Sequence, residues 1–116
     1  MMRAGAAKGI RACAACCAGV LFSGPIAAQP VDPKVAQALS DQYFCSACHA
    51  NDRTMVGPPF IAIAKKYKGD AAAPAQLAAK VKSGGQGVWG NVPMPPNPTV
   101  KDNELQQLIA WILSLE

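Results

Sequence analysis

The sequence predicts an all-α domain of four to five helices, and three observations support this fold class. Apolar residues recur at helical spacing in separate stretches, as expected for helices with one buried face. The clearest stretch is the C-terminal one, which places five apolar side chains along one stripe: Leu105, Leu108, Ile109, Ile112 and Leu113. The closest approach to a strand, residues 87–92, is short and interrupted by glycine. Four prolines within residues 93–98 exclude both a helix and the interior of a sheet there.

The expected helices have recognisable starts. The first begins at Pro33, because Asp32 is a good N-cap and proline suits the first helical position, and it is expected to run into residues 45–49. Three more helices are expected over the ranges 59–67, 73–82 and from about 102 towards the C-terminus. Thr99 or Asp102 is the expected N-cap of the last helix, which should cross the first and close the fold.

The chemistry of the chain is concentrated in the motif Cys45-Ser46-Ala47-Cys48-His49. Side chains three positions apart lie on one face of a helix, so both thiols can reach one flat object. The imidazole of His49 is turned by about 100° from Cys48 and can point at the centre of that object. The object that fits is a haem, with thioether bonds to Cys45 and Cys48 and an iron bond to His49.

Two other interpretations of the motif lack support. A thioredoxin-like redox pair needs a βαβ pattern nearby, and a structural zinc site needs four Cys or His ligands. From Gln29 onwards the chain holds two cysteines and one histidine. The earlier cysteines do not make a second haem motif, because Cys17 follows Cys13-Ala14-Ala15-Cys16 where histidine is required. One covalently bound haem c is therefore the expected cofactor.

Residues 1–28 have the features of a secretory signal peptide. An apolar run over residues 12–22 is followed by a Gly-Pro break and by Ala28, after which cleavage is expected. The basic residues that precede the run are Arg3, Lys8 and Arg11. The run is shorter than the about 20 residues that span a bilayer, so stable membrane insertion is not expected, and a retained anchor is the alternative. Residues 29–116 are then an exported domain, which places the protein in the periplasm.

The charge of this domain is close to neutral. The whole chain has 11 basic and 7 acidic residues and a net charge of +4, but three basic residues lie in the expected signal peptide. The remainder carries 8 basic and 7 acidic residues, a net charge of +1, and no basic block of the kind that binds nucleic acid. A domain of this size buries little surface, so a covalent haem would also supply part of its core.

A histidine that binds iron needs its second ring nitrogen held in place, usually by a carbonyl or a carboxylate. The backbone carbonyl of Pro58, in a rigid loop shortly after His49, is the candidate. The alternative is that Pro58 and Pro59 serve only to open the next helix. The two roles are compatible, because the first uses a carbonyl and the second a ring.

The iron also needs a sixth ligand or an open position, and methionine is a known ligand. The expected domain contains Met55 and Met94. Chain length excludes neither, but Met94 lies in a frame of prolines that can hold a side chain still. Met55, in the loop after His49, is expected to pack as an apolar side chain against the haem edge. Met94 is therefore the expected sixth ligand.

From Asp32 to Ser114 the chain resembles the small class I bacterial cytochromes c, specifically the cytochrome c-551 type. The segments that carry the resemblance follow the order and spacing of that family: Asp32-Pro33, Cys45-Ser46-Ala47-Cys48-His49-Ala50, Met55-Val56-Gly57-Pro58, Gln86-Gly87-Val88-Trp89-Gly90, Val92-Pro93-Met94-Pro95-Pro96-Asn97 and Leu113-Ser114. The resemblance implies a cytochrome c domain over residues 29–116, with helices wrapped around one covalently bound haem.

The resemblance also implies roles for single residues. Met94 matches the sixth ligand of the family, and Pro58 matches the residue whose carbonyl holds the ligand histidine. Trp89 matches an indole that donates to a haem propionate, and Asn97 matches a side chain near the methionine sulfur. Lys80 lies where relatives carry arginine towards a propionate, although lysine offers a point charge rather than a planar fork.

These features predict a monomeric periplasmic electron carrier and not an enzyme. Its expected partners are redox proteins: a cytochrome bc-type donor or another carrier, and a terminal oxidase or nitrite reductase as acceptor. Surface lysines could steer an acidic partner or form an ordinary solvated face. The alternatives are a haem subunit or domain of a larger oxidoreductase, and a haem peroxidase or gas sensor. The last would lack the commonest proton-transfer group, since the chain has one histidine.

Overall fold

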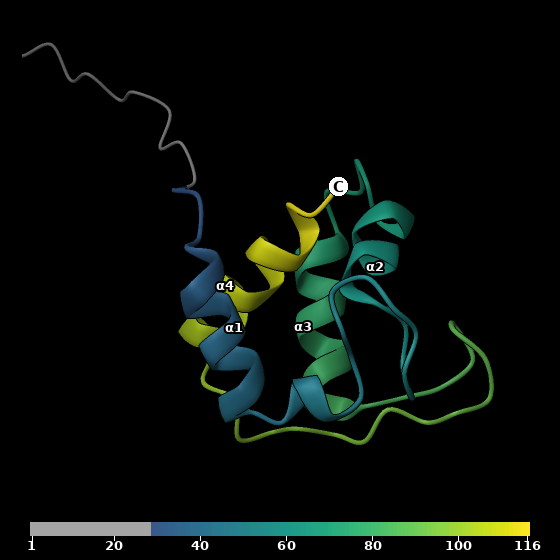
Figure 1. The fold of residues 1–116 in the computed structure, drawn as a ribbon. Helices are drawn as coiled ribbons and strands as arrows, with labels where there is room; N and C mark the ends of the chain where they lie inside the picture. Colours follow the sequence, from purple (N-terminus) through teal and green to yellow (C-terminus); the bar gives the residue numbers. More distant parts are fainter. Residues whose placement is uncertain (1–28) are drawn as a thin grey trace, which may run out of the picture.

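The computed structural model describes residues 29–116, and the predicted signal peptide lies outside them. The described part contains four α-helices and one turn of 3₁₀ helix at Cys45–Ala47 (Figure 1). The α-helices are α1 (Pro33–Gln42), α2 (Phe60–Lys66), α3 (Ala73–Ser83) and α4 (Asp102–Leu113). Within residues 29–116 the only β-type pairing is an isolated bridge between Gly85 and Met94. The all-α prediction is confirmed.

Helix α4 is the centre of the packing, because it contacts α1, α2 and α3 (Figure 1). Its apolar stripe enters two groups of buried side chains. The larger group joins α1, α2 and α4 through Ala36, Phe60, Ile63, Leu108, Trp111 and Ile112. The smaller group joins the start of α4 to the segment before it through Val100, Leu105 and Ile109. Burial of this stripe brings the first and last helices together, as the sequence predicted.

The prediction that the first helix continues into the haem motif is wrong. The start of α1 is as expected, since the Asp32 carboxylate accepts a hydrogen bond of 2.8 Å from the Lys34 amide. The helix ends at Gln42, and Phe44 has a left-handed backbone with φ +59°. A left-handed residue interrupts a right-handed helix, so the motif begins anew as a 3₁₀ turn.

The expected N-cap of α4 is also wrong. Lys101 occupies the N-cap position and provides no side-chain cap. Asp102 is the first helical residue, and its carboxylate lies 2.9 Å from the Lys82 ammonium. Thr99 donates its hydroxyl to the Asn97 side chain at 3.0 Å. The side chains of both expected caps thus have other partners. The Asp102 carboxylate still lies in the first turn of α4, where its negative charge interacts favourably with the helix dipole.

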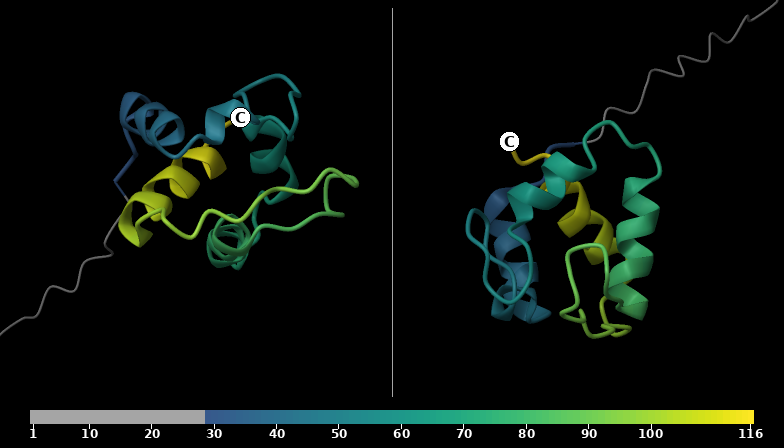
Figure 2. Two further views of the ribbon diagram at one scale, coloured as in Figure 1. Left: turned by 90° about the horizontal axis from the view of Figure 1, so that it is seen from below. Right: turned by 90° about the vertical axis from the view of Figure 1, so that its right-hand side faces the viewer.

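A long segment without helix connects α3 to α4. It starts with Gly84, which ends α3 with φ +68°, and then doubles back on itself (Figure 2). Two backbone hydrogen bonds between Gly85 and Met94, of 3.0 and 2.8 Å, close the returning part. We call residues 84–98 the Met94 arm. No helix among residues 29–116 is long and apolar enough to cross a membrane.

Candidate haem site

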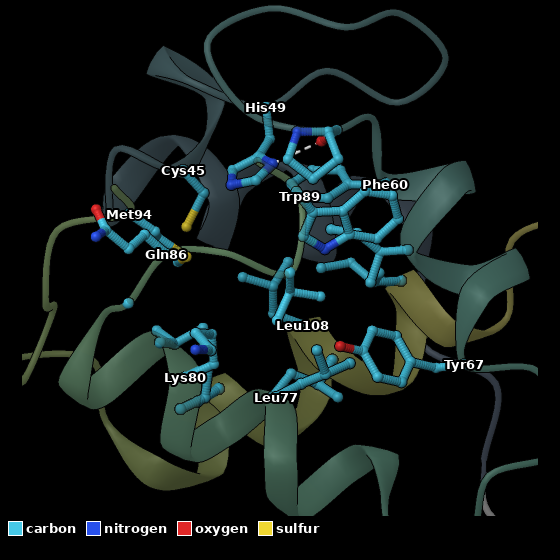
Figure 3. Close-up of a pocket in the computed structure, with 18 of the residues that line it drawn as sticks. Cys45, His49, Phe60, Tyr67, Leu77, Lys80, Gln86, Trp89, Met94 and Leu108 are labelled. Atoms are coloured by element: carbon cyan, nitrogen blue, oxygen red, sulfur yellow. Dashed lines mark hydrogen bonds between the residues drawn. The ribbon is translucent and has the colours of Figure 1, made fainter. Parts of the chain in front are cut away.

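One large cavity lies between the haem motif, the Met94 arm and helices α2, α3 and α4. It contains ≈ 880 Å³ of space, including the part that is open to solvent. Its walls are mainly apolar, with Phe60, Leu77 and Leu108 among the lining residues. In Figure 3 the His49 ring lies at one end of the cavity, and Leu77 and Lys80 of α3 lie at the other. The cavity therefore suits a large, flat, apolar group.

Cys45 brings a thiol to the wall of this cavity. It is half-buried, and burial raises the pKa of its thiol, with the neighbouring Cys48 adding to the rise. A neutral sulfur is therefore favoured there, and the sulfur of a thioether is neutral as well. Cys48 is half-buried and also free of any disulfide, but it does not line the cavity. Of the two motif thiols, the structure brings only Cys45 to the cavity wall.

The His49 ring is held by a hydrogen bond at one nitrogen and leaves the other available. Its Nδ1 lies 2.7 Å from the Pro58 carbonyl oxygen (Figure 3). A carbonyl can only accept, so Nδ1 carries the proton, and in the neutral imidazole Nε2 then keeps a lone pair. This is the tautomer that binds a metal through Nε2. Pro59 is the residue directly before α2, so one proline accepts a hydrogen bond from His49 and the other opens the helix.

Met94 reaches the cavity from the segment between α3 and α4, far along the sequence from His49. It is half-buried, and its backbone is paired with Gly85. The backbone of Asn97 is fixed as well, since its amide donates to the Val81 carbonyl at 2.8 Å. Met55 does not line this cavity; it is 41% exposed and borders a separate hollow that also contacts His49. The structure thus brings Met94, and not Met55, to the cavity shared with His49.

The remaining predicted site residues divide into two groups. Trp89 and Lys80 line the cavity; Trp89 is 46% exposed, and the Lys66 ammonium lies 5.5 Å from its ring centre. This distance is typical of a cation–π contact. Asn97 does not line the cavity, and its side-chain amide donates to the Tyr43 carbonyl at 3.0 Å. Asn97 therefore ties the Met94 arm to the residues just before the haem motif.

The sequence did not reveal two residues that organise the site. The Phe60 ring stacks on the His49 ring, with 5.4 Å between centres and 15° between planes. The Tyr43 hydroxyl bonds to the Glu104 carboxylate and so joins the end of α1 to α4. Phe60 could have been suspected from its place directly after Pro58-Pro59, but no sequence signal indicated the contact of Tyr43.

The residues around the cavity fit a covalently bound haem. They offer apolar walls, a half-buried thiol and an imidazole whose unprotonated nitrogen is free to bind iron. An all-α fold with a Cys-x-x-Cys-His motif beside such a cavity defines a c-type cytochrome. The family model named Cytochrome c matches residues 34–116, and the chain belongs to this family.

Individual relatives indicate which type of cytochrome c this chain resembles. Cytochrome c-551 of Pseudomonas aeruginosa is 45% identical over 95 residues, which cover 82% of this chain and 90% of the relative. Cytochrome c-552 of Hydrogenobacter thermophilus is 49% identical over 80 residues, covering 69% of this chain and 81% of the relative. The crystal structure of Nitrosomonas europaea cytochrome c552 superposes with a TM-score of 0.66 at 42% identity, covering 69% and 99% of the two chains.

These similarities confirm a class I c-type cytochrome of the c-551 type with the corresponding all-α fold. The relatives are small cytochromes c, which are electron-transfer proteins. Membership of the family implies one haem c, bound covalently through the Cys-x-x-Cys-His motif, and Cys45 and Cys48 supply its two cysteines.

Proposed function

We propose that this protein carries single electrons on one haem c, with His49 and Met94 as the axial ligands of the iron. One observation carries the proposal: His49 and Met94, which lie far apart in the sequence, line the same apolar cavity. The ligand types agree with it, because an imidazole and a thioether together fill both axial positions of a haem iron and raise its reduction potential. A filled sixth position favours electron transfer over reaction with peroxide or oxygen.

Each residue near the iron has a distinct task in this proposal. The haem supplies the one-electron chemistry. The Pro58 carbonyl holds the Nδ1 proton of His49 and so directs Nε2 to the iron. Met94 offers a soft sulfur that stabilises the reduced state. Trp89 would donate its neutral indole N–H to a haem propionate, and the Lys80 ammonium would place a positive charge near the same propionate; both residues line the cavity. Asn97 supports the arm that presents Met94.

The proposal extends to the location and the partners of the protein. Residues 1–28 act as a signal peptide, and residues 29–116 function in the periplasm after cleavage behind Ala28. The protein exchanges electrons with redox proteins, a cytochrome bc-type complex or another carrier as donor and a terminal oxidase or nitrite reductase as acceptor. N-terminal sequencing of haem-bearing protein from the periplasm is expected to begin near Gln29; a retained Met1 would instead indicate an anchored carrier.

The ligand assignment is tested by replacing Met94 with alanine. We expect the oxidised wild type to show the weak sulfur-to-iron charge-transfer band at the red end of its spectrum. Met94→Ala should lose that band, lower the reduction potential and gain binding of external ligands or peroxidase activity, because the sixth position opens. Spectroscopy, redox titration and a peroxidase assay measure the three effects.

Met55→Ala is the matched control, since it removes the other thioether of the described chain and leaves the sixth position filled. It should keep the band and the potential. If Met94→Ala left both unchanged, the ligand assignment would be wrong. If the wild type already bound external ligands or turned over peroxide, the haem-enzyme alternative would replace the carrier.

A further inference from the structure

Gly57 is the one glycine within residues 29–116 whose backbone φ angle is not positive. The other five all have positive φ angles, a region that side chains rarely tolerate: Gly69, Gly84, Gly85, Gly87 and Gly90. Gly57 has no such angle, so alanine could adopt its backbone conformation. Its lack of a side chain therefore needs a different explanation.

The His49 ring occupies the space where a side chain of Gly57 would lie. A Cβ atom on Gly57 would stand 2.7 Å from Cε1, 3.1 Å from Nδ1 and 3.2 Å from Nε2 of His49. The first distance is too short for two carbon atoms, and the others are tight. Three adjacent ring atoms would be met at once, so the Cβ would press on the rigid ring and not on a flexible side-chain end.

The backbone of Gly57 cannot easily move away from the ring. Its amide donates to the Cys48 carbonyl at 2.8 Å, and its carbonyl accepts from the Met55 amide at 3.2 Å. Pro58 and Pro59 follow directly, and their rings fix two further φ angles. An added methyl group would therefore displace the imidazole rather than the loop.

Phe60 limits the movement of the imidazole as well. Its ring stacks on His49 and is itself fixed in the core, since it is 4% exposed and meets Trp111 edge to face at 5.8 Å. The imidazole thus lies between a loop that is tied to Cys48 and a ring that is held by the core. The hydrogen bond from Nδ1 to the Pro58 carbonyl fits this one orientation.

We propose that Gly57 is a positioning residue: together with Phe60 it forms a slot that fixes the rotation of the His49 imidazole. The inference rests on the proposed role of His49 as an axial ligand and adds what sets its orientation. The slot keeps the Nδ1–H···O bond to Pro58 short. Because that bond makes the imidazole a stronger electron donor, the slot also tunes the iron.

The test is Gly57→Ala in the haem-bearing protein. The methyl group should turn the ring and lengthen its bond to Pro58. We expect the Nδ1 proton, followed by NMR in the reduced state, to exchange with solvent about tenfold faster, the effect of losing one net hydrogen bond. The reduction potential should shift upwards, since a weaker donor stabilises oxidised iron less. The sulfur-to-iron band should remain, because Met94 is untouched.

Val56→Ala is the matched control, because it changes the adjacent residue, which is 58% exposed, to the same side chain. It should leave proton exchange and potential at wild-type values. If Gly57→Ala gives no haem-bearing protein, Phe60→Leu tests the slot from its other wall and should shift both readouts in the same directions. If the variant that can be prepared kept the wild-type proton exchange rate and reduction potential, the proposal that Gly57 and Phe60 fix the His49 ring would be wrong. A wild type without the sulfur band would instead contradict the proposed ligation.

Discussion

The two ends of the haem site are built in different ways. On the His49 side, contacts act on the functional ring itself: a hydrogen bond that the ring donates to the Pro58 carbonyl, a stacked Phe60 and the close approach of Gly57. On the Met94 side, the element held in place is the backbone, which pairs with Gly85. The His49 side is thus positioned through a side chain, and the Met94 side through the main chain.

This difference follows from the chemistry of the two side chains. An imidazole is planar and has a second nitrogen, so neighbours can fix both its rotation and its tautomer. A thioether is flexible and a weak hydrogen-bond acceptor, so its position depends on where the backbone is held. Substitutions near His49 should therefore change the properties of the iron, whereas substitutions along the Met94 arm should change whether the sulfur stays in place.

The largest expected effect on stability is that of Gly84→Ala, which changes the Met94 side of the site. A Cβ there would lie 2.5 Å from the Met94 carbonyl oxygen and 2.8 Å from the Pro96 nitrogen, on a backbone with φ +68°. Strain and collision together should lower the free energy of unfolding by about 3 kcal/mol. Guanidinium unfolding of the haem protein measures the loss, and the sulfur-to-iron band should weaken before the helices unfold.

Gly69→Ala separates strain from collision. Gly69 has φ +80°, but a Cβ added there would meet no atom of residues 29–116 within 4 Å. This variant should lose only about 1 kcal/mol, the cost of the left-handed backbone alone, and should keep the band. Equal losses in the two variants would mean that the close approach to Met94 has no energetic role.

A smaller effect than that of Gly84→Ala is expected for Asn97→Val. The variant removes the donor to the Tyr43 carbonyl, which anchors the far end of the arm to the start of the haem motif. Loss of this partly buried bond should cost about 1–2 kcal/mol in thermal or denaturant unfolding. The band should persist, with a smaller shift in potential than that of Met94→Ala. Thr99→Val, which loses only the exposed bond to Asn97, is the control and should be nearly neutral.

A gain in stability is expected from Ser40→Ala, away from both sides of the haem site. Ser40 is fully buried on α1, and its hydroxyl has no hydrogen-bond partner among residues 29–116. Alanine removes the cost of burying that hydroxyl and is a better helix former, so unfolding should require about 1 kcal/mol more. Neither side of the haem site is touched, so spectrum and potential should stay constant. A less stable variant would show that the hydroxyl is satisfied, for example by a buried water.

Local sequence patterns predicted most of the fold. Start signals and apolar spacing located the beginnings of α1, α2, α3 and α4 to within a few residues, because each helix buries one face against the others; the end of α1 and the capping residue of α4 were predicted wrongly. The interruption at Phe44 was not predictable, since nothing in the side chain of phenylalanine favours a left-handed backbone. Its left-handed backbone lies where the chain turns from α1 into the haem motif.

Hydrogen bonds within the site were predictable only where their partners are close in sequence. The bond between His49 and the Pro58 carbonyl was expected, because nine residues in a proline-stiffened loop leave few arrangements. The bond from Asn97 to the Tyr43 carbonyl was not, because it joins segments that meet only after α3 and α4 have packed. The contact between Tyr43 and Glu104 was not predictable either, because these residues also lie far apart in the sequence.

The bridge between Gly85 and Met94 has a consequence for chain length. Its two hydrogen bonds close the intervening residues into a separate loop, and those next to Asn91 are exposed. Extra residues inserted after Asn91 would lengthen the loop without moving its ends, and doubling a loop costs only about 0.6 kcal/mol of closure entropy. Insertions there should be accommodated with Met94 still in place, whereas an insertion between Met94 and Asn97 would shift the sulfur relative to its anchor.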